Sequence, residues 1–143
     1  MPVSMERCVV KLDAKKEVKK VERWNKIAKE AAEQSHRQVV PKVHSVHTFK
    51  AFLEQSKHYD VCLFAYEETA KQGELAQLKQ TLENIKPGAT LLLLVGPEGG
   101  VGEKEVDLLI QHGFKPCALG PRILRTETAP IYALSAISFA LEF

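Results

Sequence analysis

Short apolar runs bounded by turn residues recur along the chain and predict buried strands. The clearest is residues 91–95, four leucines and a valine that lead directly into a glycine-rich loop. Runs of this kind are typical of strands buried in a sheet. The run at residues 60–65 has the same character. Further strands are predicted at residues 116–119, at 7–12 and at 39–46, where Pro41 favours an edge strand or a strand start.

Stretches of helical periodicity separate these runs. The longest covers residue 13 to about residue 38, and its apolar stripe consists of Val18, Val21, Trp24, Ile27, Ala28, Ala31 and Ala32. A short helix should follow a cap at Thr48, with a buried side made by Phe49, Phe52 and Leu53. Other helices are predicted around 75–82, from about 102 to 112, and from about 129 onward. This alternation predicts one α/β domain, with a parallel sheet covered by helices on both faces.

The glycine-rich loop Gly96-Pro97-Glu98-Gly99-Gly100 is the first candidate binding element. Ligands of open α/β sheets bind at the carboxyl ends of the strands, and glycine-rich loops before helices often hold anions. This loop lacks the phosphate-binding patterns G-x-x-x-x-G-K-S/T and G-x-G-x-x-G. The carboxylate of Glu98 would also repel a polyphosphate. The loop therefore suits a neutral or cationic ligand, or it is a tight strand-to-helix turn with an exposed glutamate.

The second candidate element is the loop at residues 119–130, which lies between two apolar stretches. It places Arg122, Arg125 and Glu127 close together, and Thr126 and Thr128 could cap the helix that follows. One interpretation is an ion pair with a helix cap, because charged groups packed against buried segments are costly unless they are paired. The other is an RNA-facing site formed by the two arginines beside the first loop.

The long helix carries a row of cations at Lys15, Lys16, Lys19, Lys20, Arg23, Lys26 and Lys29. Such a row can be an ordinary solvated face, or a ridge that contacts nucleic acid phosphates. Together with Arg122 of the second loop, the second interpretation gives the candidate RNA-binding residues Lys19, Arg23, Lys26, Gln34, Arg37 and Arg122.

Composition narrows the class of protein. The chain has 143 residues, 45% hydrophobic and 27% charged, and a net charge of +2 that is too small to indicate a partner. Three widely spaced cysteines predict reduced thiols and a cytoplasmic protein, and no apolar run is long enough to span a bilayer. The first residues lack the layout of a signal peptide. His44 and His47 have no third ligand nearby in sequence, so no metal site is expected.

The two loops together resemble a known family. The stretch from Leu94 to Gly100, followed by Glu103 and Glu105, and the loop at residues 119–130 are similar to the signature loops of the ribosomal small-subunit methyltransferase E family. Glu6-Arg7-Cys8 and residues 29–35 are also similar to that family. The resemblance implies a SPOUT-type fold with an α/β knot at the C-terminus, S-adenosylmethionine as methyl donor and a homodimer. It also implies N3-methylation of a uridine in 16S ribosomal RNA of the small subunit.

The resemblance assigns roles to the residues of both loops. The cofactor-binding residues are expected to be Leu94, Val95, Gly96, Pro97, Glu98, Gly99, Gly100, Leu119, Gly120, Ile123, Leu124, Thr128 and Ala129. Arg125 is expected to stabilise negative charge that develops on the uracil, and Glu127 or Glu67 to accept the N3 proton.

The resemblance also predicts that this sequence is either a fragment of a longer protein or a shortened member of the family. Members of the family carry a small β-rich, PUA-like RNA-binding domain at the N-terminus, and residues 1–143 correspond to the SPOUT methyltransferase domain without it. An alternative function is therefore an RNA-binding or assembly module that keeps the cofactor fold with little or no catalysis. A third interpretation is a nucleotide-binding α/β protein of another family.

Overall fold

The computed structural model describes residues 1–10 and 12–142. The chain forms two compact units: unit 1 comprises Met1–Ser4 and Val9–Phe52, and unit 2 comprises Met5–Cys8 and Leu53–Phe143. Along the sequence, the short segment Met5–Cys8 therefore belongs to unit 2, and the chain then returns to unit 1 at Val9. The prediction of one methyltransferase domain over residues 1–143 stays a prediction.

Unit 1 consists of a long helix and a small parallel sheet. Strand β1 (Val3–Ser4) pairs with β2 (His47–Thr48), and α1 spans Ala14–Gln34. Helix α1 begins after Asp13, whose carboxylate accepts the backbone N–H of Lys16 at 2.8 Å, as an N-cap aspartate does. The helix ends four residues earlier than predicted, because Ser35 closes it by bonding back to its last turn.

The segment after α1 is not a strand, which corrects the prediction for residues 39–46. Its backbone polar groups are held by side chains of α1 instead. Asn25 donates to the carbonyl of Val43 at 2.8 Å and accepts its N–H at 2.9 Å, and Glu17 accepts the N–H of Val46 at 2.8 Å. Because polar side chains bind this segment to the helix, little of the predicted apolar stripe is covered. Ala32 is buried, whereas Val18 and Ile27 are exposed.

The predicted strand at residues 7–12 is also wrong, because residues 7–10 and residue 12 are not in a strand. Lys11 lies outside the residues that the structure describes. Residues 6 and 7 form a turn, in which the N–H of Cys8 donates to the carbonyl of Met5 at 3.2 Å. The backbone of this segment bonds to a glutamate of unit 2 rather than to a neighbouring strand.

Unit 2 is built on a three-stranded parallel sheet in the order β4-β3-β5. The strands are β3 (Val61–Ala65), β4 (Leu91–Leu94) and β5 (Lys115–Cys117). Residues Phe64 and Leu94 are in register, as are Ala65 and Cys117, so all three strands end at one edge of the sheet. Leu63, Phe64 and Cys117 are fully buried. The predicted parallel α/β class is therefore confirmed.

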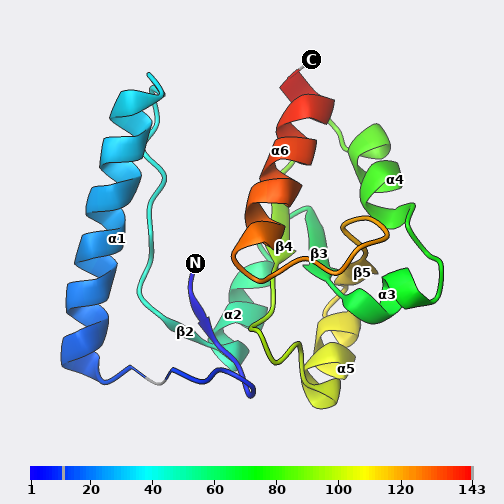
Figure 1. Cartoon of the computed structure of the whole chain (residues 1–143), viewed down its shortest axis with the longest axis horizontal. Coiled ribbons are helices and arrows are strands. Elements are labelled where there is room, and N and C mark those ends of the chain that lie inside the picture. The colour runs from blue at the N-terminus through cyan, green and yellow to red at the C-terminus, as the bar shows by residue number, and fades with distance from the viewer. Residues whose placement is uncertain (11, 143) are drawn as a thin grey trace. The chain divides into compact units, whose positions relative to one another are not determined.

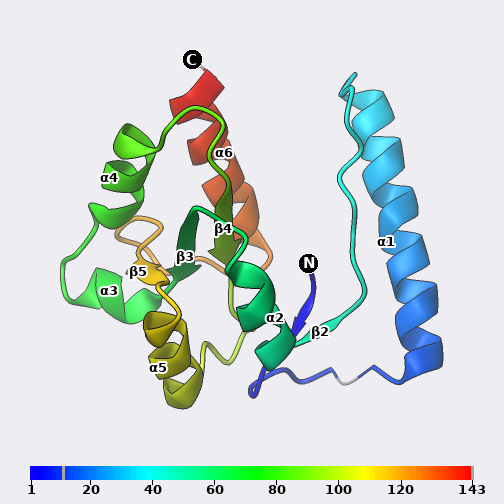
Figure 2. The same ribbon diagram turned by 180° about the vertical axis from the view of Figure 1, so that it is seen from behind.

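Helices connect and cover these strands. They are α2 (Phe49–Ser56), α3 (Glu67–Lys71), α4 (Gln77–Asn84), α5 (Glu103–Gln111) and α6 (Thr128–Glu142). Figure 1 shows α6 in front of β3 and β4, whereas α2 comes forward in the reverse view of Figure 2. The predicted cap of α2 is confirmed, since Thr48 accepts the N–H of Ala51 at 3.2 Å. The short helix α3 was not predicted.

At the other edge of the sheet, Asp60 and Thr90 bind the starts of β3 and β4 together. The carboxylate of Asp60 accepts both the N–H and the hydroxyl of Thr90 at 2.8 Å, and the Thr90 hydroxyl accepts the Asp60 N–H at 3.1 Å. None of the described helices is long and apolar enough to cross a membrane.

Candidate functional site

A pocket of about 460 Å³ opens where the three strands of unit 2 end. It is lined by residues 95–101 after β4, by residues 117–120 and 122–124 after β5, and by residues 65–68 after β3. Its size is that of a small-molecule site. The position at the carboxyl ends of parallel strands is where α/β sheets bind ligands.

The first loop, residues 96–100, is tightly shaped. The N–H of Gly100 donates to the carbonyl of Pro97 at 2.8 Å, and Gly100 has a φ of +74°, a conformation that favours glycine. A Cβ at Gly96 would lie 2.8 Å from a methyl of Val101, and one at Gly99 would lie 3.1 Å from the Cβ of Arg7. The glycines therefore let the loop pack closely against its neighbours and present backbone to the pocket.

The second loop, residues 119–127, is held less firmly. Gly120 has a φ of +100°, and a Cβ there would lie 3.6 Å from the Tyr132 hydroxyl. The loop ends where the carbonyl of Arg125 accepts the N–H groups of Thr128 and Ala129, both at 2.9 Å, which starts α6. The side chain of Arg125 is 86% exposed and lies 3.9 Å from Glu127, which is an open surface ion pair.

Most of the residues assigned to the cofactor lie together around the pocket. The residues that line it are Val95, Gly96, Pro97, Glu98, Gly99, Gly100, Leu119, Gly120, Ile123, Leu124 and Ala129. Leu94 is instead buried in β4, and Thr128 is exposed at the start of α6. The pocket thus gathers both predicted loops into one site.

The two expected catalytic residues lie beside the pocket rather than in its lining. Arg125 and Glu127 line a shallower neighbouring hollow. This hollow shares Glu98, Ile123, Leu124 and Thr126 with the main pocket. Glu67, the other candidate proton acceptor, lines the main pocket itself.

The candidate RNA-binding residues divide between the two units. Lys19, Arg23 and Lys26 lie on α1 and are exposed, with Lys26 at 3.9 Å from Glu30. Gln34 ends α1 and Arg37 follows it, so both belong to unit 1. Arg122 belongs to unit 2, where it lines the pocket.

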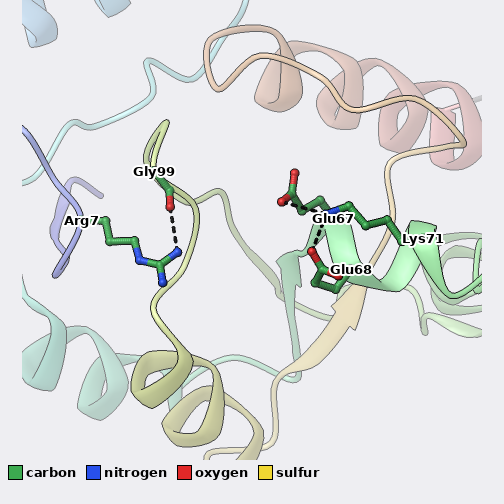
Figure 3. Close-up of polar contacts among 5 residues, drawn as sticks. All are labelled: Arg7, Glu67, Glu68, Lys71 and Gly99. Atoms are coloured by element: carbon green, nitrogen blue, oxygen red, sulfur yellow. Dashed lines mark hydrogen bonds and ion pairs between the residues drawn. The ribbon is translucent and has the colours of Figure 1, made fainter.

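Several pocket residues were not assigned to the site from the sequence, although Tyr66-Glu67-Glu68 follows a predicted strand at the end where loops usually carry function. Arg7 lines the pocket, and its Nη1 donates to the carbonyl of Gly99 at 3.0 Å (Figure 3). Tyr66 and Glu68 line it from the start of α3. Glu6-Arg7-Cys8 was part of the sequence resemblance, but the interpretation as a strand concealed its place at the site.

The wall of the pocket that Glu67 and Glu68 form at the start of α3 is acidic, and its negative charge is partly neutralised. Lys71 lies 2.5 Å from Glu68 and 3.4 Å from Glu67 (Figure 3), and the hydrogen bond to Glu68 raises the pKa of Lys71. Glu98 and Glu103 also line the pocket, against the cations Arg7 and Arg122. Carboxylates and bare backbone together suit a ligand that carries positive charge.

Burial raises the pKa of the Cys117 thiol, which lines the pocket, to about 12, so this thiol stays protonated at neutral pH. Among residues 1–10 and 12–142, no group of three or more His, Cys, Asp and Glu side chains is arranged to hold a metal ion.

The sequence and fold match known proteins. The profile of the RNA methyltransferase domain matches residues 1–138. Ribosomal RNA small subunit methyltransferase E of Bacillus subtilis is 53% identical over 142 residues, which are 99% of this chain and 56% of that protein.

Two solved structures extend the comparison. Ribosomal RNA small subunit methyltransferase E from Neisseria gonorrhoeae, bound to S-adenosyl methionine, has a TM-score of 0.81 at 34% identity and covers 98% of this chain and 55% of that one. A putative methyltransferase from Legionella pneumophila with bound cofactor SAM has a TM-score of 0.80 at 34% identity, over 97% and 54%. The chain spans about half the length of these relatives. It therefore belongs to the RNA methyltransferase domain family, with the SPOUT type of fold, and is similar over about half of their length to proteins named ribosomal RNA small subunit methyltransferase E.

Proposed function

We propose that this chain binds S-adenosylmethionine in the pocket of unit 2 and methylates N3 of a uridine in 16S ribosomal RNA of the small subunit. The observation that carries the proposal is the pocket, in which both family-like loops meet at the carboxyl ends of β3, β4 and β5. Related proteins of the same fold are described as bound to that cofactor.

The residues that are present fit the cofactor. When bound, it supplies a methyl group on a positively charged sulfur. Backbone of the first loop, which lines the pocket, would lie against its uncharged parts. Gly96 and Gly99 allow this arrangement because they let the loop pack closely against Val101 and Arg7. The carboxylates of Glu67 and Glu98, both in the lining, would favour its positive charges.

The protein residues would then orient the uridine and remove a proton. Methyl transfer requires an in-line approach, so positioning of the base supplies much of the acceleration. Glu67 is our candidate for accepting the N3 proton, because it lines the pocket whereas Glu127 lies in the neighbouring hollow. Arg125, in the neighbouring hollow, would donate to the uracil oxygen that gains negative charge.

The RNA would enter over this rim, splayed so that the base reaches the pocket. Arg122, Arg125 and the α1 cations Lys19, Arg23 and Lys26 would contact phosphates, which makes the affinity dependent on salt. The cytoplasm is the compartment where the small subunit is available.

The homodimer and the C-terminal knot belong to the same proposal. Helix α6 buries Ala129 and Ala133 but exposes most of its large apolar side chains: Ile131, Tyr132, Leu134, Phe139 and Leu141. A helix apolar on nearly all sides needs a partner. A second copy of this chain can supply the same apolar face about a two-fold axis, so we take it as the occupant.

The test has a binding arm and a transfer arm. Calorimetric titration should give binding of S-adenosylhomocysteine in about the micromolar range and no binding of ATP. Tritium from labelled S-adenosylmethionine should then appear in 30S particles, and digestion of the RNA should identify 3-methyluridine. Transfer should fall in Glu67→Gln more than in Glu127→Gln. Cofactor binding without any transfer would favour the RNA-binding or assembly module, and ATP binding alone would refute the proposal.

A further inference from the structure

One wall of the pocket comes from a segment remote in sequence, Met5–Cys8. Met5 is buried in unit 2, and the N–H of Cys8 returns to its carbonyl, so the segment makes a turn with Arg7 near its apex. The Arg7 side chain lines the pocket from this turn. The turn is thus anchored at its base and leaves the guanidinium available to the loop opposite.

Glu105 fixes this turn to the start of α5. Its side chain is only 6% exposed, although a buried carboxylate is costly without partners. One carboxylate oxygen accepts the N–H of Glu6 at 2.8 Å, and the other accepts the N–H of Gly102 at 3.1 Å. A single buried side chain therefore joins the Met5–Cys8 segment to Gly102, the residue that precedes α5 and lies two residues after the first loop.

Arg7 in turn holds one particular peptide group of that loop. The peptide between Gly99 and Gly100 has its carbonyl bound by Arg7 Nη1 at 3.0 Å and its N–H bound to the Pro97 carbonyl at 2.8 Å. A glycine–glycine peptide has unusual freedom to rotate, because neither residue carries a Cβ. Hydrogen bonds at both the carbonyl and the N–H of this peptide group restrict that rotation.

We propose that Arg7, placed by Glu105, is a positioning residue that holds the Gly99–Gly100 peptide in the orientation the pocket's ligand meets. The inference rests on the proposed function for the identity of the ligand. Arg7 acts here through the loop, which is preorganised before the ligand arrives, and such preorganisation raises affinity by lowering the ordering that binding requires.

The test compares Arg7→Ala and Arg7→Lys with Lys79→Ala, a surface cation on α4 that is remote from the pocket lining. Hydrogen exchange of the Gly100 amide in the ligand-free protein should become faster in Arg7→Ala. Affinity for S-adenosylhomocysteine should fall about three- to tenfold, as expected for the loss of one typical intramolecular hydrogen bond at an exposed position. Arg7→Lys should be intermediate, because it keeps a donor but not the guanidinium geometry. Lys79→Ala should match the wild type in both.

Glu105→Gln supplies an independent arm, since one acceptor oxygen becomes an amide donor while the shape is kept. It should also speed exchange at Gly100, with Arg7 intact. Unchanged exchange and affinity in Arg7→Ala would overturn the proposal. Lower affinity with unchanged exchange would also overturn it, because Arg7 would then act directly on the ligand. If the wild type fails to bind S-adenosylhomocysteine, the proposed function fails, while the exchange measurement still decides the role of Arg7.

Discussion

The two loops of the pocket differ in how they are held. The first, residues 96–100, is bound by its own turn and by Arg7. The second, residues 119–127, is joined to α6 by backbone bonds, and its charged pair Arg125–Glu127 stands open to solvent. Both loops expose charge, Glu98 in the first and Arg125 and Glu127 in the second, but the backbone of the first is also fixed by Arg7.

This difference suggests that the two loops have different functions. A rigid, backbone-lined surface suits a small ligand of fixed shape, since little ordering is needed on binding. Exposed charges are weakly stabilising on their own, so their presence at the rim is better explained by a partner such as RNA. If so, changes in the first loop should affect cofactor binding, and changes in the second should affect transfer.

Gly100→Val should have the largest effect. Valine is β-branched and strongly disfavoured at a φ of +74°, so the loop must change shape. We expect the affinity for S-adenosylhomocysteine to fall about a hundredfold. This factor corresponds to the upper end of the free-energy cost of one strained residue. Gly88→Val is the matched control, because Gly88 has a φ of +81° but is absent from the pocket lining. Tight binding by a folded Gly100→Val protein would remove the first loop from the cofactor site.

Arg125→Ala should leave cofactor binding unchanged and slow methyl transfer to 30S particles about tenfold or more, as removal of a donor to developing charge does. The free energy of unfolding should change by less than about 1 kcal/mol, because the pair with Glu127 is exposed. Calorimetry, tritium transfer and denaturant unfolding measure the three quantities. Weaker cofactor binding with normal transfer would reverse the roles given to the two loops.

Leu134→Asp should separate the dimer without unfolding the chain, since Leu134 is 66% exposed on α6. Light scattering should give a dimer for the wild type at tens of micromolar, roughly where an interface of standard size holds, and a monomer for the variant. Ile110→Asp, an exposed apolar position on α5, should remain dimeric. The second loop leads into α6, so hydrogen exchange in residues 119–127 should rise more than in 96–100.

Asp60→Ala should produce the smallest effect, because the Asp60–Thr90 contact lies at the sheet edge away from both loops. Hydrogen bonds from the backbone and side chain of Thr90 lower the pKa of Asp60. The charged form is therefore favoured in the folded protein, and its stabilisation is complete above the ordinary carboxyl pKa and lost as pH falls through the lowered value. Denaturant unfolding should find the variant less stable at neutral pH and equal to wild type in strong acid. Asp107→Ala, an exposed change on α5, should lack this pH dependence.

The sheet of unit 2 was predictable because its strands are buried on both faces. Apolar runs at residues 60–65 and 91–95 have no other stable placement, so periodicity was enough to find β3 and β4. The two loops were found by composition, and their meeting at one edge follows from parallel strands. The short helix α3 was missed, because five residues carry too little periodicity to be recognised.

Contacts made by side chains to distant backbone could not be predicted. Nothing in the local pattern near residue 43 indicates that Asn25 takes both of its backbone groups, so an apolar, weakly alternating segment looked like an edge strand. In the same way, the apolar residues among 7–12 favoured a strand. The local sequence does not indicate that the neighbouring Glu6 N–H donates to Glu105, or that the backbone turns at residues 6 and 7.

The attachment of the Met5–Cys8 segment has a consequence for how the protein is made. Its bonds to Glu105 and to Gly99 join residues 99 and 92 positions apart. During synthesis this segment leaves the ribosome long before either partner exists, and most of unit 1 is translated in between. Contacts of such high sequence separation form late and slowly, because the entropic cost of closing a long loop must be met before these contacts can form. The pocket should therefore be among the last features to mature, and a nascent chain that stops before α5 should bind no cofactor.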